Sequence, residues 1–476
     1  MDPRSVQPQR ISGVGDLLNV LQTEHHSAIS GMPLTGFSTD SRGVQPGHIF
    51  VAIPGARTDG HTYIEKALTS GASACLVQDR ALVDQHAHCI YTPNTVSALG
   101  LLAAAHKKSL PTRMVAITGS VGKTTTKEIL YQLVAPLVSA RKTAGNFNST
   151  IGLPVQVLSL EPNDEWMVCE LGMSTPGEIR KLMQITQPEI GLWTAVKPVH
   201  LANFDSIEGI ARAKAEMVEE LNPNGTLVYN GDDPLVCKYA QAFSGRKLRY
   251  SMLDPKADIG CRIHPFSDWK GTQFEIRFES GGPQRFFLPL PGRFNVQNAL
   301  AASATAYAMG LRPQEFGLQF KRIQSEKGRS QLYQFQKDIQ LVDDSYNANP
   351  YAFSQVLRSF APLANRGFRW LICGDMLELG PREVAMHQEL GSEIAQYGFD
   401  RVTFVGSLSR FAFHAFNRES SSPGVAEHFP DVQAAMEVLD RFVPAESRIW
   451  IKASRGIHLD RLAEKMIEKL DRMEGA

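Results

Sequence analysis

The stretch Met114-Val-Ala-Ile-Thr-Gly-Ser-Val-Gly-Lys-Thr-Thr-Thr-Lys-Glu-Ile-Leu130 decides the fold of this chain. Residues 114–117 have strand character, a tight polar turn follows, and a helical pattern begins near Lys123. Gly119 and Gly122 allow a sharp turn that brings backbone N–H groups close to an anion, and the helix N-terminus adds positive charge. The stretch therefore predicts a phosphate-binding loop between a strand and a helix.

The side chains of this loop suit a nucleotide triphosphate. Lys123 can reach the β- and γ-phosphate oxygens, and the hydroxyl of Thr124 can bind Mg²⁺. One departure from the common pattern is that Ile117 occupies the position of the first Gly, which comes later, at Gly119. The alternative is an ordinary strand–turn–helix with a chance Gly-Lys-Thr. We expect phosphate contacts from Gly119, Ser120, Val121, Gly122, Lys123, Thr124 and Thr125.

Composition limits the class of protein. A chain of 476 residues is too long for one core and indicates about three domains. Lys+Arg and Asp+Glu both number 49, so neither nucleic acid nor an acidic membrane is the expected partner. Six scattered cysteines without a Cys-x-x-Cys pair are typical of a reducing compartment. With no signal region and no apolar run long enough to cross a bilayer, the sequence predicts a cytoplasmic protein without membrane insertion.

Alternating strand and helix patterns predict an α/β fold with mostly parallel sheets. We expect a small α/β domain at 1–110, a central phosphate-loop domain at 111–312 and a Rossmann-like domain at 313–476. A helix at 94–109 would link the first two. The strands expected in the central domain are 114–118, 166–171, 190–196 and 226–230.

Polar residues follow several of these strands, and ligands of open sheets gather beyond the carboxyl ends of the strands. Glu170 ends one strand and His200 follows the next, so the two could hold Mg²⁺. Asp344 could bond ribose hydroxyls, and Lys452 and Arg455 could meet an anion. The alternatives are a surface Glu and a capping His.

Lys214 stands in a helix that is expected to begin near Ser206. Its position lies on the inward stripe, between other inward-facing positions of the helix. One explanation is snorkelling, in which the ammonium reaches the rim. The other is a desolvated amine with a lowered pKa, which could react with CO₂ to form a carbamate. The apolar members of the stripe are Ile207, Ile210, Ala211, Met217, Val218 and Leu221.

Three loops carry further polar candidates. The segment 143–154 is placed to contact a substrate over the phosphate site. Asn295 opens a helix, where its amide could read a base edge or simply cap the helix. The clusters 38–42 and 59–61 could bind a polar ligand, or could be solvated turns.

Taken together, the motifs resemble the Mur ligase family, ATP-dependent amide-bond-forming enzymes of peptidoglycan synthesis. The resemblance covers nearly the full length. It rests on Ser38-Thr-Asp-Ser-Arg42, Asp59-Gly-His61, Thr118-Gly-Ser-Val-Gly-Lys-Thr124, Thr143-Ala-Gly-Asn-Phe-Asn148, Glu170-Leu-Gly172, Ala213-Lys-Ala-Glu216, Asp343-Asp-Ser-Tyr-Asn-Ala-Asn-Pro350 and Gly374-Asp-Met-Leu-Glu-Leu-Gly380.

The resemblance is strongest to the member that adds D-alanyl-D-alanine to UDP-N-acetylmuramoyl-tripeptide through an acyl phosphate. It implies ATP, two Mg²⁺ ions and a CO₂-derived carbamate on Lys214. It also implies small-molecule substrates, and we expect a monomer. The alternatives are a folyl-polyglutamate-type ligase, a phosphate-loop ATPase or GTPase acting as a switch, and a scaffold paralogue without activity.

The resemblance also implies roles for single residues. Catalysis would depend on Lys123, Lys214 and His200, and the metals would be held by Thr124, Glu170, His200 and carbamylated Lys214. Adenosine would contact Asn295, Arg329 and Asp344, and His387 lies in a family-like position. The substrates would contact Ser41, Arg42, Asp59, His61, Asn146, Asn148, Asn347, Lys452 and Arg455. The sequence departs from the family pattern at Phe294 (usually His), Ala453 (usually Gly) and Asp460 (usually Glu).

Overall fold

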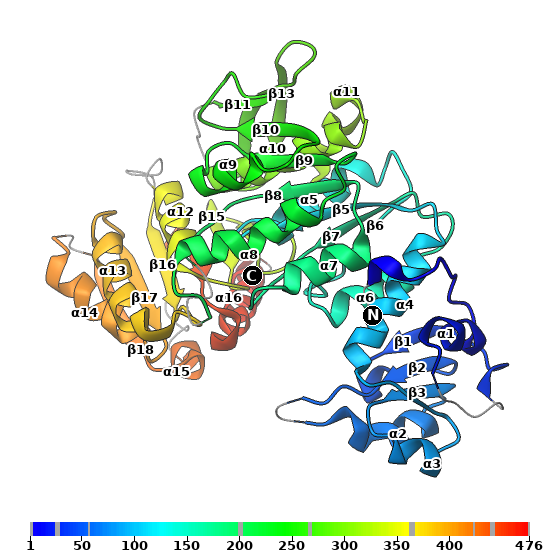
Figure 1. Ribbon diagram of the computed structural model, residues 1–476. Helices are drawn as coiled ribbons and strands as arrows, with labels where there is room; N and C mark the ends of the chain where they lie inside the picture. The colour runs from blue at the N-terminus through cyan, green and yellow to red at the C-terminus, as the bar shows by residue number, and fades with distance from the viewer. Residues whose placement is uncertain are drawn as a thin grey trace.

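The computed structural model contains three α/β units, each built on its own sheet. Figure 1 shows the N-terminal and C-terminal units on either side of the central one. The predicted α/β fold with parallel sheets is confirmed, whereas the residue borders of the three domains stay predictions. The structure describes residues 3–23, 29–55, 58–198, 203–264, 269–360, 367–421, 424–437 and 443–474.

The N-terminal unit is a four-stranded parallel sheet in the order β1-β2-β3-β4. Its last helix begins after Asn94, whose side chain accepts a hydrogen bond from the Ser97 amide at 2.8 Å and caps the helix, so the helix predicted at 94–109 is confirmed. The strands are β1 (Gly36–Ser38), β2 (His48–Val51), β3 (Ala74–Val77) and β4 (Cys89–Tyr91), and the helices are α1 (Val14–Leu21), α2 (Ile64–Thr69), α3 (Ala81–Gln85) and α4 (Thr95–Lys108).

The central unit is a nine-stranded sheet in the order β13-β12-β11-β10-β9-β8-β5-β7-β6, antiparallel only at β12 and β13. The four predicted strands are present, but β8 ends at Trp193 instead of residue 196. Its strands are β5 (Arg113–Thr118), β6 (Ala140–Lys142), β7 (Trp166–Glu170), β8 (Ile190–Trp193), β9 (Thr226–Asn230), β10 (Arg246–Ser251), β11 (Ile259–Ile263), β12 (Thr272–Arg277) and β13 (Gln284–Leu288). Its helices are α5 (Lys123–Val134), α6 (Gly152–Leu158), α7 (Glu178–Thr186), α8 (Ile207–Glu220), α9 (Pro234–Ala240) and α10 (Arg293–Ala308).

The C-terminal unit is a six-stranded sheet in the order β14-β15-β19-β16-β17-β18, parallel except for β14. Its strands are β14 (Gln331–Phe335), β15 (Ile339–Asp344), β16 (Arg369–Gly374), β17 (Arg401–Val405), β18 (Val425–Phe429) and β19 (Arg448–Lys452). The helices after residue 310 are α11 (Pro313–Gly317), α12 (Pro350–Phe360), α13 (Glu383–Ala395), α14 (Ser409–Glu419), α15 (Val432–Glu437) and α16 (Leu459–Glu474).

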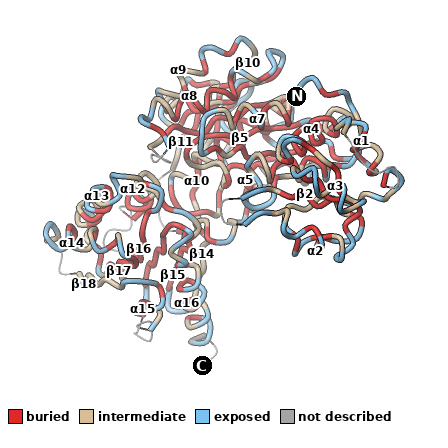
Figure 2. The backbone as a smooth tube through the Cα atoms, turned by 60° about the horizontal axis from the view of Figure 1, so that its bottom comes forward, coloured by how far each residue is buried: buried red, intermediate tan, exposed pale blue. Residues whose placement is uncertain are grey.

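The first two units share a hydrophobic core. Leu99 and Leu102 of α4 belong to one buried cluster with Val51 of the N-terminal sheet and with Leu153 and Leu182 of the central helices. In Figure 2 the buried residues follow the strands and the inner faces of the helices. No helix in the described ranges is long and apolar enough to span a bilayer.

Candidate active site

The loop between β5 and α5 has a backbone that only glycine allows at two positions. Gly119 has φ +146°, and a Cβ there would lie 1.9 Å from the Thr194 hydroxyl oxygen. Gly122 has φ +83°, and its Cβ would lie 2.5 Å from Oδ1 of Asn298. The glycine that comes later than in the common phosphate-loop pattern is therefore required here.

The residues that follow β8 hold this loop in place. The Ser120 amide donates a hydrogen bond to the carbonyl of Ala195 at 2.7 Å, and the Thr194 hydroxyl donates to the carbonyl of Val121 at 2.7 Å. These contacts explain why β8 ends early, since its last residues turn to bind the loop. Lys123 Nζ donates to the carbonyl of Gly119 at 2.7 Å. Burial lowers the pKa of Lys123, and the charge of Glu170 opposes that shift.

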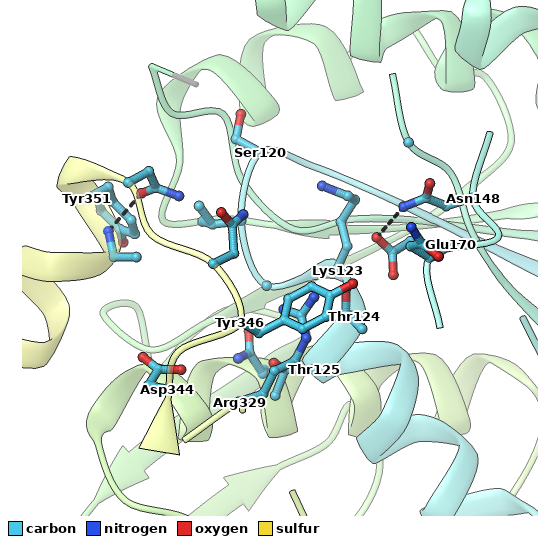
Figure 3. Close-up of a pocket in the computed structure, with 18 of the residues that line it drawn as sticks. Ser120, Lys123, Thr124, Thr125, Asn148, Glu170, Arg329, Asp344, Tyr346 and Tyr351 are labelled. Carbon is cyan, nitrogen blue, oxygen red and sulfur yellow. Dashed lines mark hydrogen bonds between the residues drawn. The ribbon is translucent and has the colours of Figure 1, made fainter. Parts of the chain in front are cut away.

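A cavity of about 390 Å³ extends from the loop to the C-terminal unit. Figure 3 shows Lys123 and Glu170 of the central unit in this cavity together with Arg329, Asp344 and Tyr346. The structure thus brings most of the predicted central and C-terminal site residues to one place. The predicted residues that line it are Ser120, Val121, Gly122, Lys123, Thr124, Thr125, Asn146, Asn148, Glu170, Arg329, Asp344, Asn347 and Lys452.

Glu170 presents a carboxylate oxygen that suits a cation. The residue is 3% exposed, and its Oε1 accepts a hydrogen bond from Asn148 Nδ2 at 3.0 Å. Its Oε2 is buried, accepts no hydrogen bond from the described residues and lies 4.0 Å from Lys127 Nζ. The described residues contain no cluster of three or more His, Cys, Asp or Glu side chains for a metal. One carboxylate and one hydroxyl beside a phosphate site are the donors that Mg²⁺ commonly uses with a nucleotide, so Glu170 and Thr124 fit this ion.

Lys214 lies on the buried face of α8, as its place in the helical pattern predicts. At 1% exposure the side chain has almost no contact with solvent, which disfavours the snorkelling alternative. Within the described part of the chain, the ammonium makes no hydrogen bond or ion pair. Burial, assisted by the nearby charge of Lys123, holds the pKa of Lys214 well below its ordinary value, while Glu170 acts in the opposite direction.

The C-terminal wall of the cavity carries a buried ion pair. Lys452 Nζ donates to Asp344 Oδ2 at 2.7 Å, and Asp344 Oδ1 accepts from the Ser330 amide at 3.0 Å. These contacts fix the carboxylate, which still lines the cavity.

Two guanidinium groups lie close to the ring of Tyr346. Arg329 is 4.2 Å from the centre of its ring and Arg455 is 4.8 Å from it. The motif at 343–350 pointed to this loop, but an aromatic residue gave no ligand signal in the sequence. Arg455 itself is exposed and is not among the residues that line the cavity.

Asn295, predicted as an adenosine contact, is not among the residues that line the cavity. It is 1% exposed, and its Nδ2 donates to the carbonyl of Pro291 at 2.7 Å, so the amide closes its own loop. Asn298 lines the cavity instead. Which of the two asparagines meets the loop depends on how α10 packs, and an adenosine contact of Asn295 stays a prediction.

The loop after β16, which carries the motif Gly374–Gly380, is held by hydrogen bonds to neighbouring segments. Asp375 accepts hydrogen bonds from the amides of Leu408 and Ser409, and thereby binds the start of α14. His387 Nε2 accepts from the Met376 amide at 3.0 Å, and burial lowers the pKa of His387. Both residues position the loop, and neither lines the cavity.

The departures from the expected motifs are accommodated locally. Ala453 is buried, and its methyl group faces Gly374, where a Cβ would lie only 2.7 Å away. Phe294 lines the cavity and contacts the ring of Trp450, with centroids 6.3 Å apart. Asp460 stands in the first turn of α16, where a carboxylate is favourable.

The predicted ligands of the N-terminal unit lie in two turns, away from this cavity. His61 Nδ1 is 2.7 Å from Asp59 Oδ1, and its Nε2 accepts from the Gln78 amide at 2.9 Å. Arg42 pairs with Asp40 and lowers the pKa of that carboxyl to about 2. Ser41 is buried beside this pair. His200 lies outside the described residues.

Three family models match successive parts of the chain. The Mur ligase family catalytic domain matches residues 33–118, the Mur ligase middle domain matches 117–306, and the Mur ligase glutamate ligase domain matches 328–455.

Whole proteins match over nearly their full length. The Escherichia coli protein named UDP-N-acetylmuramoyl-tripeptide–D-alanyl-D-alanine ligase is 33% identical, with 96% of this chain and 98% of the relative covered. A crystal structure of MurF from Acinetobacter baumannii has a TM-score of 0.86 at 27% identity, covering 97% of this chain and all of the other. MurF from Thermotoga maritima, solved in complex with ADP, has a TM-score of 0.80 at 26% identity and covers 92% of this chain and 98% of the other. With these matches and the phosphate-loop site described above, the chain belongs to the Mur ligase family.

Proposed function

We propose that this chain joins D-alanyl-D-alanine to UDP-N-acetylmuramoyl-tripeptide and consumes ATP in doing so. The names of the full-length relatives support this activity. The observation that carries the proposal is a single cavity in which the phosphate loop and Glu170 face Asp344, Asn347 and Lys452 of the C-terminal unit. Such a site, formed from both units, can hold a nucleotide and a second substrate side by side.

The chemistry runs in two steps. An oxygen of the tripeptide's terminal carboxylate bonds to the γ-phosphorus of ATP while the bond to ADP breaks, which gives an acyl phosphate. The amine of the dipeptide then bonds to the acyl carbon, loses a proton and expels phosphate. The carboxylate must approach a triphosphate, so Lys123 and the N–H groups of residues 119–124 would offset that repulsion.

The donor set in the cavity fits a divalent cation. Thr124 and Glu170 would hold one ion, and His200, Glu170 and a modified Lys214 would hold a second. Bound Mg²⁺ supplies charge neutralisation at the phosphates. The buried Oε2 of Glu170, which accepts no hydrogen bond from the described residues, is the observation on which this fit rests.

We propose that Lys214 reacts with CO₂ to form a carbamate. Its lowered pKa favours the neutral amine that this reaction needs. The nitrogen of the neutral amine bonds to the carbon of CO₂ and releases a proton, so a buried neutral group near Lys123 becomes an anion. With ¹³C-bicarbonate, we expect a carbamate carbon resonance that is missing in Lys214→Ala. Full ligase activity in Lys214→Ala would contradict the role of this group.

The substrates would occupy different units. Arg329 and Asp344 would bind the adenosine, and we propose Asn298, which lines the cavity, as a contact in addition to the predicted Asn295. The N-terminal unit would take the UDP-sugar end through Ser41, Arg42, Asp59 and His61. The peptide and the dipeptide would contact Asn146, Asn148, Asn347, Lys452 and Arg455. We place the reaction in the cytoplasm, with a monomer as the active species and domains at 1–110, 111–312 and 313–476.

The test is a reconstituted reaction with ATP, Mg²⁺, UDP-N-acetylmuramoyl-tripeptide and D-alanyl-D-alanine. We expect the pentapeptide product by mass spectrometry, and phosphate release that requires the dipeptide. Phosphate release that does not require the dipeptide would favour a phosphate-loop ATPase instead. No nucleotide binding at all would favour an inactive scaffold, and product only with a folyl substrate would favour the related amide ligase.

A further inference from the structure

Trp269 belongs to the central unit by sequence but to the C-terminal unit by packing. It lies in the turn between β11 and β12, and its side chain is completely buried. Its ring is edge-on to Phe360 at 5.0 Å between centroids and to Trp450 at 5.2 Å. Both partners belong to the C-terminal core, and Trp269 is a member of that same buried cluster.

The hairpin that carries Trp269 is rigidly attached to the central sheet. The register pairs Ile263 with Phe274 and Thr272 with Leu288. Gly271 has φ +154°, and a Cβ there would lie 2.4 Å from the carbonyl oxygen of Leu288. The backbone next to Trp269 therefore fits closely against β13, so the position of the indole is tied to the central sheet.

The contacts of Trp269 are connected to the candidate site through strand β19 and helix α10. Trp450 lies on β19, two residues before Lys452, which pairs with Asp344 in the cavity. Trp450 also contacts Phe294 of α10, which lines the cavity. We call Trp269, Phe294, Phe360 and Trp450 the aromatic junction. It connects the hairpin, the strand that carries Lys452 and the start of α10.

We infer that Trp269 is a positioning residue that sets the orientation of the C-terminal unit over the phosphate loop. It would thereby control nucleotide affinity through Asp344 and Arg329 without contacting the nucleotide. The aromatic junction can fix the orientation of the C-terminal unit, because edge-to-face aromatic rings pack with a defined geometry and bury a large area. The inference rests on the nucleotide site of the proposed function.

The test is the dissociation constant of Mg·ADP, measured by calorimetry, in Trp269→Ala and Trp269→Phe. We expect Trp269→Ala to weaken nucleotide binding about tenfold, because the two halves of the cavity lose their fixed relation. Trp269→Phe should retain most of the affinity, since the indole N–H has no hydrogen-bond partner among the described residues and a phenyl ring keeps the edge-on contacts.

Phe404→Ala is the matched control. Phe404 is buried in the same cluster but contacts Phe413 and Phe416, away from the aromatic junction. It should lower the stability of the C-terminal unit and leave nucleotide affinity within about twofold. If it weakens nucleotide binding as much as Trp269→Ala does, the effect is general destabilisation and the inference fails.

A folded Trp269→Ala protein with unchanged nucleotide affinity would also overturn the inference. If Trp269→Ala does not fold, Trp269→Leu is the variant that tests the inference. It keeps apolar volume but loses the edge-on aromatic contacts, so it must weaken nucleotide binding more than Trp269→Phe does. Affinity for UDP-N-acetylmuramoyl-tripeptide, measured separately, should change little in either variant. Since nucleotide binding is measured without an acceptor, failure of the ligase assay and failure of this inference give different results.

Discussion

The two junctions of the central unit are built differently. At the N-terminal junction α4 contributes to one continuous apolar core, and Gly100 lets it approach α7 so closely that a Cβ would lie 3.1 Å from Ile185 Cδ1. At the C-terminal junction a cavity lined by residues of both units lies between them, and the aromatic junction supplies apolar contact next to it. A junction that admits a nucleotide cannot be filled like a core. We therefore expect the first two units to behave as one body and the third to be held by a few contacts.

The largest effect on activity should come from Lys123→Met, which removes a cation from the phosphate loop at the C-terminal junction. We expect kcat to fall by a factor on the order of 10³ or more, because a cation that offsets phosphate charge is lost. The free energy of unfolding should change by less than about 1 kcal/mol, since a partly desolvated charge is removed as well. Steady-state kinetics and urea unfolding measure the two quantities. The exposed Lys181→Met is the control and should retain activity.

Leu102→Ala should have the opposite effect to Lys123→Met: a large loss of stability with little change at the nucleotide site. Leu102 is fully buried in the shared core, so its truncation should lower the free energy of unfolding by about 2–5 kcal/mol. Nucleotide affinity should stay within about twofold, because the phosphate loop is distant from this change. A calorimetric scan would show whether the first two units unfold in one transition. A separate early transition of the N-terminal unit would contradict the comparison.

The N-terminal junction should also be sensitive to acid through His106. Its Nδ1 accepts from the Ile11 amide at 3.0 Å and its Nε2 lies 3.0 Å from the Leu160 carbonyl, an arrangement that needs the neutral ring. Burial lowers the pKa of His106 in the folded protein, so the unfolded state binds the proton first. Stability is complete above the ordinary pKa near 6.5 and is lost as the pH falls below it towards the folded value.

The measurement is the free energy of unfolding against pH for the native protein and His106→Gln. Glutamine can make both hydrogen bonds and does not titrate. Between pH of about 7.5 and about 5, the native protein should lose roughly 1 kcal/mol more than the variant. Parallel pH profiles would show that His106 does not titrate in this window.

The smallest effect should come from Tyr351→Leu at the C-terminal junction. Lys197 Nζ lies 5.1 Å above the ring of Tyr351, so the variant removes a cation–π contact between the units. The ion pair of Lys197 with Asp233 stays intact. Nucleotide binding should weaken by about 0.5–1 kcal/mol, or roughly two- to fivefold. If Tyr351→Leu weakened nucleotide binding more than Trp269→Ala does, the main contact between these units would not be the aromatic junction.

Several features could be predicted because they depend on residues near one another in sequence. The turn at 119–122 follows from its glycines and its flanking strand and helix. The inward position of Lys214 follows from the period of α8, and the caps Asn94 and Ser206 follow from residue type. Family membership also followed from such local motifs.

Other features depend on contacts between distant segments. The periodicity of α10 does not say which of Asn295 and Asn298 faces the phosphate loop. That depends on the close contact between Gly122 and Asn298, which are far apart in sequence. The residues next to Tyr346 in sequence do not predict that two guanidinium groups lie close to its ring.

By itself, then, the sequence determined the phosphate loop, the α/β architecture and the buried Lys214, since each depends on local backbone preference or on helical period. The tertiary structure alone decided that a tryptophan of the central unit lies in the C-terminal core and that Ala453 fits against Gly374. Both depend on packing between segments far apart in the chain, where close fit, not residue type, determines which groups meet.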